Sequence, residues 1–142
     1  PQAFNFAKPV IQNLDFSFSG LKTSFLYLVK KKVEQDSDFI ELNQADLCAS
    51  IQRTIVEILI EKTRKALLQT GIKQLVIGGG VSANQELRDE IERLGQKLNV
   101  KTFIPKLAFT TDNAAMIGIT GYFKYLEGQF CSHNISPSAR QY

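Results

Sequence analysis

Three consecutive glycines at positions 78–80 separate an apolar run from a helical pattern. The apolar run covers residues 75–77, and Leu87, Ile91 and Leu94 then recur at the spacing of one helix face. Glycine loses more conformational freedom on folding than any other residue, so such a run needs a turn with positive φ or a ligand held against the backbone. The sequence therefore predicts a strand, a glycine turn and a helix, in that order.

The other patterns extend this unit to an α/β fold. The expected elements are a strand over 16–19, a helix from residue 21, a long helix over 43–71, a strand over 75–77, a helix over 83–94, a strand over 100–105 and a helix over 112–126. Asn43 is expected to be the N-cap of the long helix. Alternating strands and helices predict a parallel sheet, whose ligands gather at the carboxyl ends of the strands.

Composition favours a single globular domain. The chain has 142 residues, of which 44% are hydrophobic and 22% are charged. Its two cysteines, Cys48 and Cys131, show no CxxC spacing, which favours a reducing compartment over a disulfide framework. No apolar run approaches the length of a membrane span, so the expected location is the cytoplasm. The net charge is +3, and the basic stretches at 30–32 and 62–65 suit a solvated helix face or nucleic-acid phosphates.

The glycine turn has two interpretations. At the carboxyl end of a strand, glycine N–H groups can approach an anion or a ribose, and the following helix dipole favours negative charge. A nucleotide is then the natural ligand, although the stretch is neither a P-loop nor a GxGxxG motif. The alternative is a tight turn in which the glycines allow close helix–strand packing. Ser82 and Gln85 match a capping box, and Asn84 suits a ribose or base contact or a local cap.

Asp112 is the second candidate. It lies at the expected start of the last helix, where free N–H groups and the dipole favour a carboxylate, so capping alone explains it. A carboxylate at a strand-to-helix corner of an α/β protein is also a place where metal ions are held. The single histidine, His133, is given no role. Cys48 is expected to be a buried small hydrophobe on the long helix.

Three segments, taken together, resemble a known family. They are DFSFSGLKTS, LVIGGGVSANQELR and FTTDNAAMIGITGY. In this order they resemble the carboxyl-terminal half of the tRNA N6-adenosine threonylcarbamoyltransferase family, formerly described as O-sialoglycoprotein endopeptidases, and the resemblance covers residues 15–126. It implies an α/β fold that forms one lobe of an actin-like ATPase, with a mixed sheet and flanking helices over residues 1–128 and an extended tail over 129–142.

The resemblance also implies a reaction. The family is a group of transferases that move threonylcarbamoyl from threonylcarbamoyl-adenylate to N6 of adenosine 37, in the anticodon loop of tRNAs reading ANN codons. They work with other proteins of the same pathway. By resemblance, Gly78, Gly79 and Gly80 pass close to the adenine nucleotide, Asn84 contacts substrate, and Asp112 is a ligand of one divalent metal ion of the iron or zinc class.

The chain departs from the family in one respect. Family members carry two metal-binding histidines in an HxxxH motif, and SGGHT-type phosphate loops, in a preceding part that this sequence does not contain. We therefore expect a carboxyl-terminal fragment without the amino-terminal lobe, inactive by itself, whose uncovered apolar surface drives self-association. Ser19 and Lys22 of the first segment receive no role. The alternative is a noncatalytic scaffold of the same fold that binds a nucleotide or a partner protein.

Overall fold

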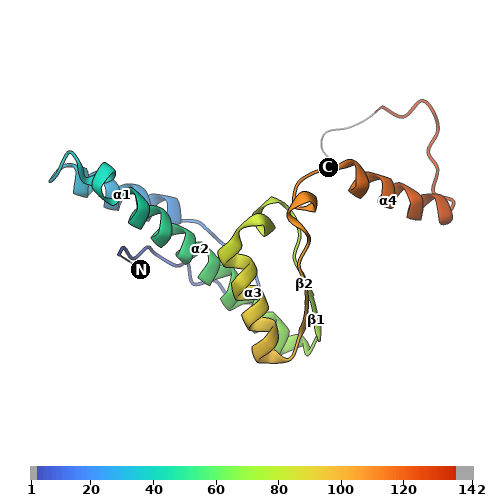
Figure 1. The fold of residues 1–142 in the computed structure, drawn as a ribbon, viewed down its shortest axis with the longest axis horizontal. Coiled ribbons are helices and arrows are strands. Elements are labelled where there is room, and N and C mark those ends of the chain that lie inside the picture. Colours follow the sequence, from blue (N-terminus) through green and yellow to red (C-terminus); the bar gives the residue numbers. More distant parts are fainter. Residues whose placement is uncertain (1–2, 137–142) are drawn as a thin grey trace.

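A computed structural model of the chain describes residues 3–136. Its elements are α1 (Leu21–Val33), α2 (Phe39–Thr70), β1 (Gln74–Val76), the 3₁₀ turn η1 (Gly80–Ala83), α3 (Gln85–Leu98), β2 (Lys101–Phe103), the 3₁₀ turn η2 (Leu107–Phe109) and α4 (Ala114–Leu126). Figure 1 shows an elongated molecule with α1 at one end and α4 at the other. Within the described part the protein is a mostly helical α/β structure.

The sheet has the predicted parallel topology but is small. β1 pairs with β2 in parallel, with Leu75 opposite Thr102, and α3 forms the crossover between them. The sheet described over residues 3–136 has only these two strands, so the expected mixed sheet is not seen there. The strand expected at 16–19 is also absent, because no neighbouring strand pairs with this segment; it ends in Gly20, whose φ is 81°.

The long helix begins earlier than predicted. α2 has 32 residues, about 48 Å of helix, and it ends where Gly71 adopts a left-handed φ of 68°. Asn43 is not its N-cap, because the helix already starts at Phe39 and the Asn43 side chain donates to the Phe39 carbonyl over 2.9 Å. An amide that bonds the carbonyl one turn back lies inside a helix.

Three apolar clusters share α2. On one side Leu47 and Ile58 pack with Phe6 and Leu21 of the amino-terminal segment and α1. On another side of α2, a second cluster joins α2 to α3 and the sheet, and its buried members are Val56, Leu87 and Ile91. A third, near the end of α2, contains Leu67, Leu94 and Val100. The long helix is therefore the common wall of the whole packed region.

Gly95 allows α3 to lie close to the sheet. A Cβ atom at this position would lie 2.5 Å from Cγ2 of Thr102 and 2.8 Å from the backbone oxygen of Val100. Both distances are below normal van der Waals contact, and the second neighbour is backbone that cannot turn away. Close helix–strand packing thus depends on Gly95.

We predict that Gly95→Ala destabilises the chain by about 1–3 kcal/mol, because the added methyl group overpacks the α3–β2 contact. Gly118→Ala is the matched control. Its Cβ meets no atom within 4 Å on exposed α4, so the change should be neutral or slightly stabilising. Urea unfolding of both variants measures the difference, and equal midpoints would contradict the packing role of Gly95.

A polar network joins α2 to α3 and to the amino-terminal segment. Arg53 donates to Glu57 over 3.0 Å, to Glu86 over 2.9 Å and to Glu90 over 3.2 Å, while Lys8 pairs with Glu57. These hydrogen bonds raise the pKa of Arg53. Burial raises the pKa of the Glu57 carboxyl, but hydrogen bonds from Lys8 and Arg53 outweigh burial and leave the pKa below its usual value.

The Glu57 carboxylate should therefore make folding sensitive to acid. Its folded pKa lies below the unfolded value of about 4.3, so its stabilisation is complete above about pH 5 and is lost as the pH falls through the folded pKa. Glu57→Gln should lose less stability than the parent between about pH 5 and pH 3. Urea unfolding at a series of pH values measures this, with exposed Glu61→Gln as control. Parallel pH profiles for the parent and Glu57→Gln would contradict the assignment.

α4 and the segment after it are uncovered. Every residue of α4 is exposed, although the helix carries Ile117, Ile119 and Phe123. Residues 129–136 of the expected tail form no helix or strand, and the rest of the tail lies outside the described residues.

Cys48 on α2 is exposed, so the expectation that it is buried was wrong: its neighbour Leu47 faces the core instead. None of the helices described over residues 3–136 is long and apolar enough to cross a membrane.

Candidate functional site

The glycine loop forms at the carboxyl end of β1, as predicted. The ladder continues for one residue beyond the strand, where the Ile77 amide donates to the Phe103 carbonyl over 3.2 Å. Gly79 follows with φ 82° and ψ 171°, a conformation that is essentially restricted to glycine, and η1 then leads into α3. The turn explains Gly79 by backbone geometry alone.

Gly78 and Gly80 are not explained in the same way. Neither has a positive φ, and a Cβ atom built on either one meets nothing within 4 Å. Close helix–strand packing therefore does not account for the glycine run, since Gly95 has that role. Both glycines are exposed and leave open space beside the backbone at the carboxyl edge of the sheet.

Asn84, and not Ser82, caps the following helix. The Oδ1 atom of Asn84 accepts from the Leu87 amide over 3.0 Å, and its amide nitrogen donates to Oε1 of Gln52 on α2 over 2.9 Å. Ser82 is buried, and its hydroxyl donates to the Gly79 carbonyl over 2.6 Å, so the capping box expected with Gln85 does not form. The local cap interpretation of Asn84 is thus confirmed; a substrate contact stays a prediction.

Arg88 connects the segments that leave the two strands. Its guanidinium donates to the Ser82 carbonyl over 2.8 Å and to the Pro105 carbonyl over 2.7 Å. The glycine loop and the segment toward Asp112 are therefore held at the same edge of the sheet. Neither Arg88 nor Gln52 was found from the sequence, because their partners lie 17 and 32 residues away with no local pattern to signal the contact.

Asp112 lies outside the helix cap. Asn113 is the N-cap of α4, since its Oδ1 atom accepts from the Met116 amide over 2.9 Å. The capping interpretation of Asp112 was therefore wrong, and the residue is exposed. Within residues 3–136 no cluster of three His, Cys, Asp or Glu side chains could hold a metal ion. Asp112 alone does not form a metal site, and within the described residues it does not belong to such a cluster.

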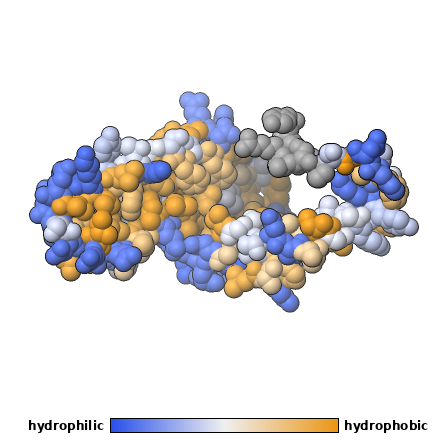
Figure 2. All heavy atoms as spheres, turned by 90° about the horizontal axis from the view of Figure 1, so that it is seen from above, coloured by the Kyte–Doolittle hydropathy of each residue, from blue (hydrophilic) through white to orange (hydrophobic). Residues whose placement is uncertain are grey.

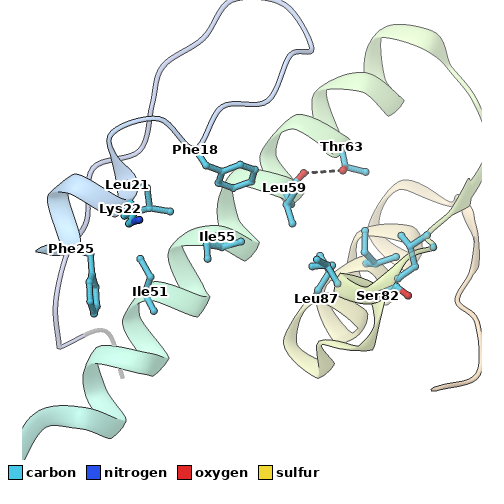
Figure 3. A pocket seen from close by; sticks show the side chains of 14 residues that line it. Phe18, Leu21, Lys22, Phe25, Ile51, Ile55, Leu59, Thr63, Ser82 and Leu87 are labelled. Atoms are coloured by element: carbon cyan, nitrogen blue, oxygen red, sulfur yellow. Dashed lines mark hydrogen bonds between the residues drawn. The ribbon is translucent and has the colours of Figure 1, made fainter. Parts of the chain in front are cut away.

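A large apolar groove opens beside the glycine loop. It has a volume of about 780 Å³ and lies between α1, α2, the loop and α3. Figure 3 shows its lining side chains, with Ile51, Ile55 and Leu59 of α2 between those of α1 and those near Ser82 and Leu87. Figure 2 shows hydrophobic atoms gathered over the α1–α2 half, with hydrophilic atoms around them. Gly78 also lines the groove, so the groove adjoins the glycine loop.

Comparison with known proteins identifies the family. Residues 1–119 match the family model described as tRNA N6-adenosine threonylcarbamoyltransferase. The chain belongs to this family. A relative of that name from Porphyromonas gingivalis is 52% identical over 140 residues, which are 99% of this chain and 41% of the relative. The relative from Christiangramia forsetii is 50% identical over the same shares, and that from Thermosipho africanus is 45% identical over 88% of this chain and 37% of the relative.

The chain thus spans about 41% of the length of these threonylcarbamoyltransferase relatives. The matched region contains every candidate residue, namely Gly78, Gly79, Gly80, Asn84 and Asp112. Of these, the three glycines and Asn84 lie in one continuous turn, whereas Asp112 follows the neighbouring strand.

We predict different effects for two glycines of the turn. Gly79→Ala should destabilise the chain by about 1 kcal/mol or more, because a side chain is strained at its positive φ. Gly80→Ala should leave stability within about 0.5 kcal/mol of the parent, because its Cβ enters open space. Urea unfolding compares the two. A stable Gly79→Ala variant would show that the turn does not require its φ.

Proposed function

We propose that this chain provides the glycine-loop side of a tRNA-modifying transferase with an actin-like ATPase fold. The proposed reaction moves threonylcarbamoyl from threonylcarbamoyl-adenylate to N6 of adenosine 37 in tRNAs reading ANN codons. The supporting observation is the pair Gly78 and Gly80: neither packing nor φ explains them, and they leave open backbone at the carboxyl edge of a parallel sheet. The ligand that we propose for this edge is an adenine nucleotide, as the resemblance to the family implies.

In the proposed reaction the exocyclic amine of adenosine attacks the carbonyl carbon of the threonylcarbamoyl group. The new C–N bond forms as the bond to the adenylate phosphate breaks; AMP leaves with the electron pair, and the amine loses a proton. Gly78 and Gly80 let the backbone approach the adenylate, and Asn84 contacts it from the start of α3. The tRNA base must leave its stack to reach such a site, which an anticodon loop permits at low cost.

Asp112 is proposed as one ligand of a divalent metal ion of the iron or zinc class. The described residues do not complete that site, so its remaining ligands would belong to another part of the transferase. A metal held there would orient and polarise oxygen atoms of the substrate. The chain alone should therefore neither hold the metal nor modify tRNA. We further propose that the intact enzyme acts in the cytoplasm, together with other proteins of the pathway.

A noncatalytic scaffold that binds a nucleotide or a partner protein is the second candidate. The observation that favours it is that no cluster of three His, Cys, Asp or Glu side chains includes Asp112 within the described residues. A transfer assay separates the two functions, because a scaffold would bind nucleotide without transferring the acyl group.

A chimeric enzyme tests the proposal. The 140 residues of the Porphyromonas gingivalis relative that match this chain are replaced by it, at 52% identity, and transfer to a tRNA reading ANN codons is measured with threonylcarbamoyl-adenylate. We expect the chimera to be active. Asp112→Asn should lower transfer and bound metal more than roughly tenfold. Gly80→Val should weaken adenylate binding roughly fivefold or more, about 1 kcal/mol, because a side chain then occupies the open backbone face.

One variant serves as a control in the chimera. Asp46→Asn makes the same change on α2. It should keep parent activity. A folded but inactive chimera that binds adenylate would favour the scaffold. Unchanged transfer in Asp112→Asn would overturn its role as a metal ligand.

A further inference from the structure

Within residues 3–136, two apolar surfaces are uncovered and match each other in length. The groove contains a row of α2 side chains, Ile51, Ile55, Leu59 and Thr63, that extends over about 18 Å. α4 has 13 residues and is about 20 Å long. A helix without a polar face, as α4 is, belongs in a packed interior. In helix-in-groove binding, a recurring mode of recognition, an apolar helix face and an apolar groove bury each other.

We propose that α4 of a second copy of this chain occupies the groove, and that the two copies exchange their α4 helices. The face that fits is formed by Met116, Ile119, Phe123 and Leu126, which follow each other at steps of three or four residues. They are 43%, 52%, 56% and 60% exposed. This inference concerns the chain by itself and does not rest on the proposed enzymatic function.

Charge sets the direction of the docked helix. Lys22 is the only charged residue among the described residues that line the groove, and Figure 3 shows it toward the Ile51 end of the α2 row. α4 ends at Leu126 and Glu127 follows directly. The carboxyl end of a helix carries partial negative charge, so this end and Glu127 should both lie near Lys22, while Lys124 of the last turn lies outside the docking face. α4 would then run antiparallel to α2.

The connection to α4 favours a second copy over the same chain. η2 and the cap of α4 are ordered: Thr110 is 4% exposed, and its hydroxyl donates to the Leu107 carbonyl over 2.8 Å. Figure 1 shows that this connection directs α4 away from α1 and α2. Docking into the groove of its own chain would require these contacts to break. Exchange keeps them and covers two grooves at once, which is the arrangement of a closed two-fold dimer.

The docked arrangement brings two exposed cysteines of different copies together. Cys48 lies three residues before Ile51 on the same helix row, and Cys131 lies five residues beyond the end of α4. Antiparallel docking of α4 along α2 puts Cys131 of one copy beside Cys48 of the other. A disulfide bond between Cys48 of one copy and Cys131 of the other would therefore report the exchange of α4.

The first experiment is sedimentation of the 142-residue chain and of two α4 variants. The parent, of 15.9 kDa, should form a dimer. Phe123→Asp, on the docking face, should raise the dissociation constant of the dimer roughly tenfold or more. Tyr125→Asp makes the same kind of change on the opposite side of α4 and should leave the constant unchanged. A monomeric parent, or equal loss in both variants, would overturn the proposal.

The second experiment uses mild oxidation of Cys48→Ser and Cys131→Ser chains. Mixed together, the two variants should give a disulfide-linked dimer between the remaining Cys131 and Cys48, identified by peptide mass. Neither variant alone can form this bond. If the parent gives only an intramolecular bond and the mixture gives none, α4 covers the groove of its own chain and the exchange is wrong.

Discussion

The rest of the structure depends on the burial of α2 on several sides. One 32-residue helix contributes to all three apolar clusters, and the two-stranded sheet packs against it through Leu75 of β1 and through α3. A two-stranded sheet has too little surface for a core of its own. Packing against α2 gives it one, and the Arg53 network fixes α3 along the same helix. Because the glycine loop leads directly into α3, the packing of α3 on α2 also fixes the position of the loop.

The sequence predicted the elements that follow from local periodicity. The long helix, the strand–turn–helix unit and the parallel pairing were all correct, because apolar spacing and glycine position determine them within a short stretch. The errors concern polar residues near a helix start, for which the local sequence allows more than one hydrogen-bond partner. Asn43, Ser82 and Asp112 were each assigned to a helix cap, whereas the α-helix N-caps with a side-chain hydrogen bond in the described part of the chain are Asn84 and Asn113. Short polar side chains near a helix start all suit a cap, and only the backbone path selects one.

Long-range contacts explain what the sequence could not predict about the candidate site. The Asn84–Gln52 and Arg88–Pro105 hydrogen bonds hold the loop against α2 and the second strand, and no spacing rule connects those residues. Conversely, the sequence grouped the glycines as one motif, while the structure separates them. Gly79 is required by its φ, whereas Gly78 and Gly80 are required by nothing within the described chain. The open backbone face of the glycine loop can therefore be assigned to Gly78 and Gly80.

The glycine loop and the groove are not independent, because Gly78 and Ser82 belong to the groove wall and to the loop. Ser82 ties the two together, since its hydroxyl bonds the carbonyl of Gly79 and its own carbonyl bonds Arg88. A helix in the groove would therefore press on the turn that faces the proposed nucleotide. If each ligand changes the affinity for the other, the change must be equal in both directions. Whatever occupied the groove, α4 or another part of a longer transferase, would therefore lie beside Gly78 and Ser82 of the glycine loop.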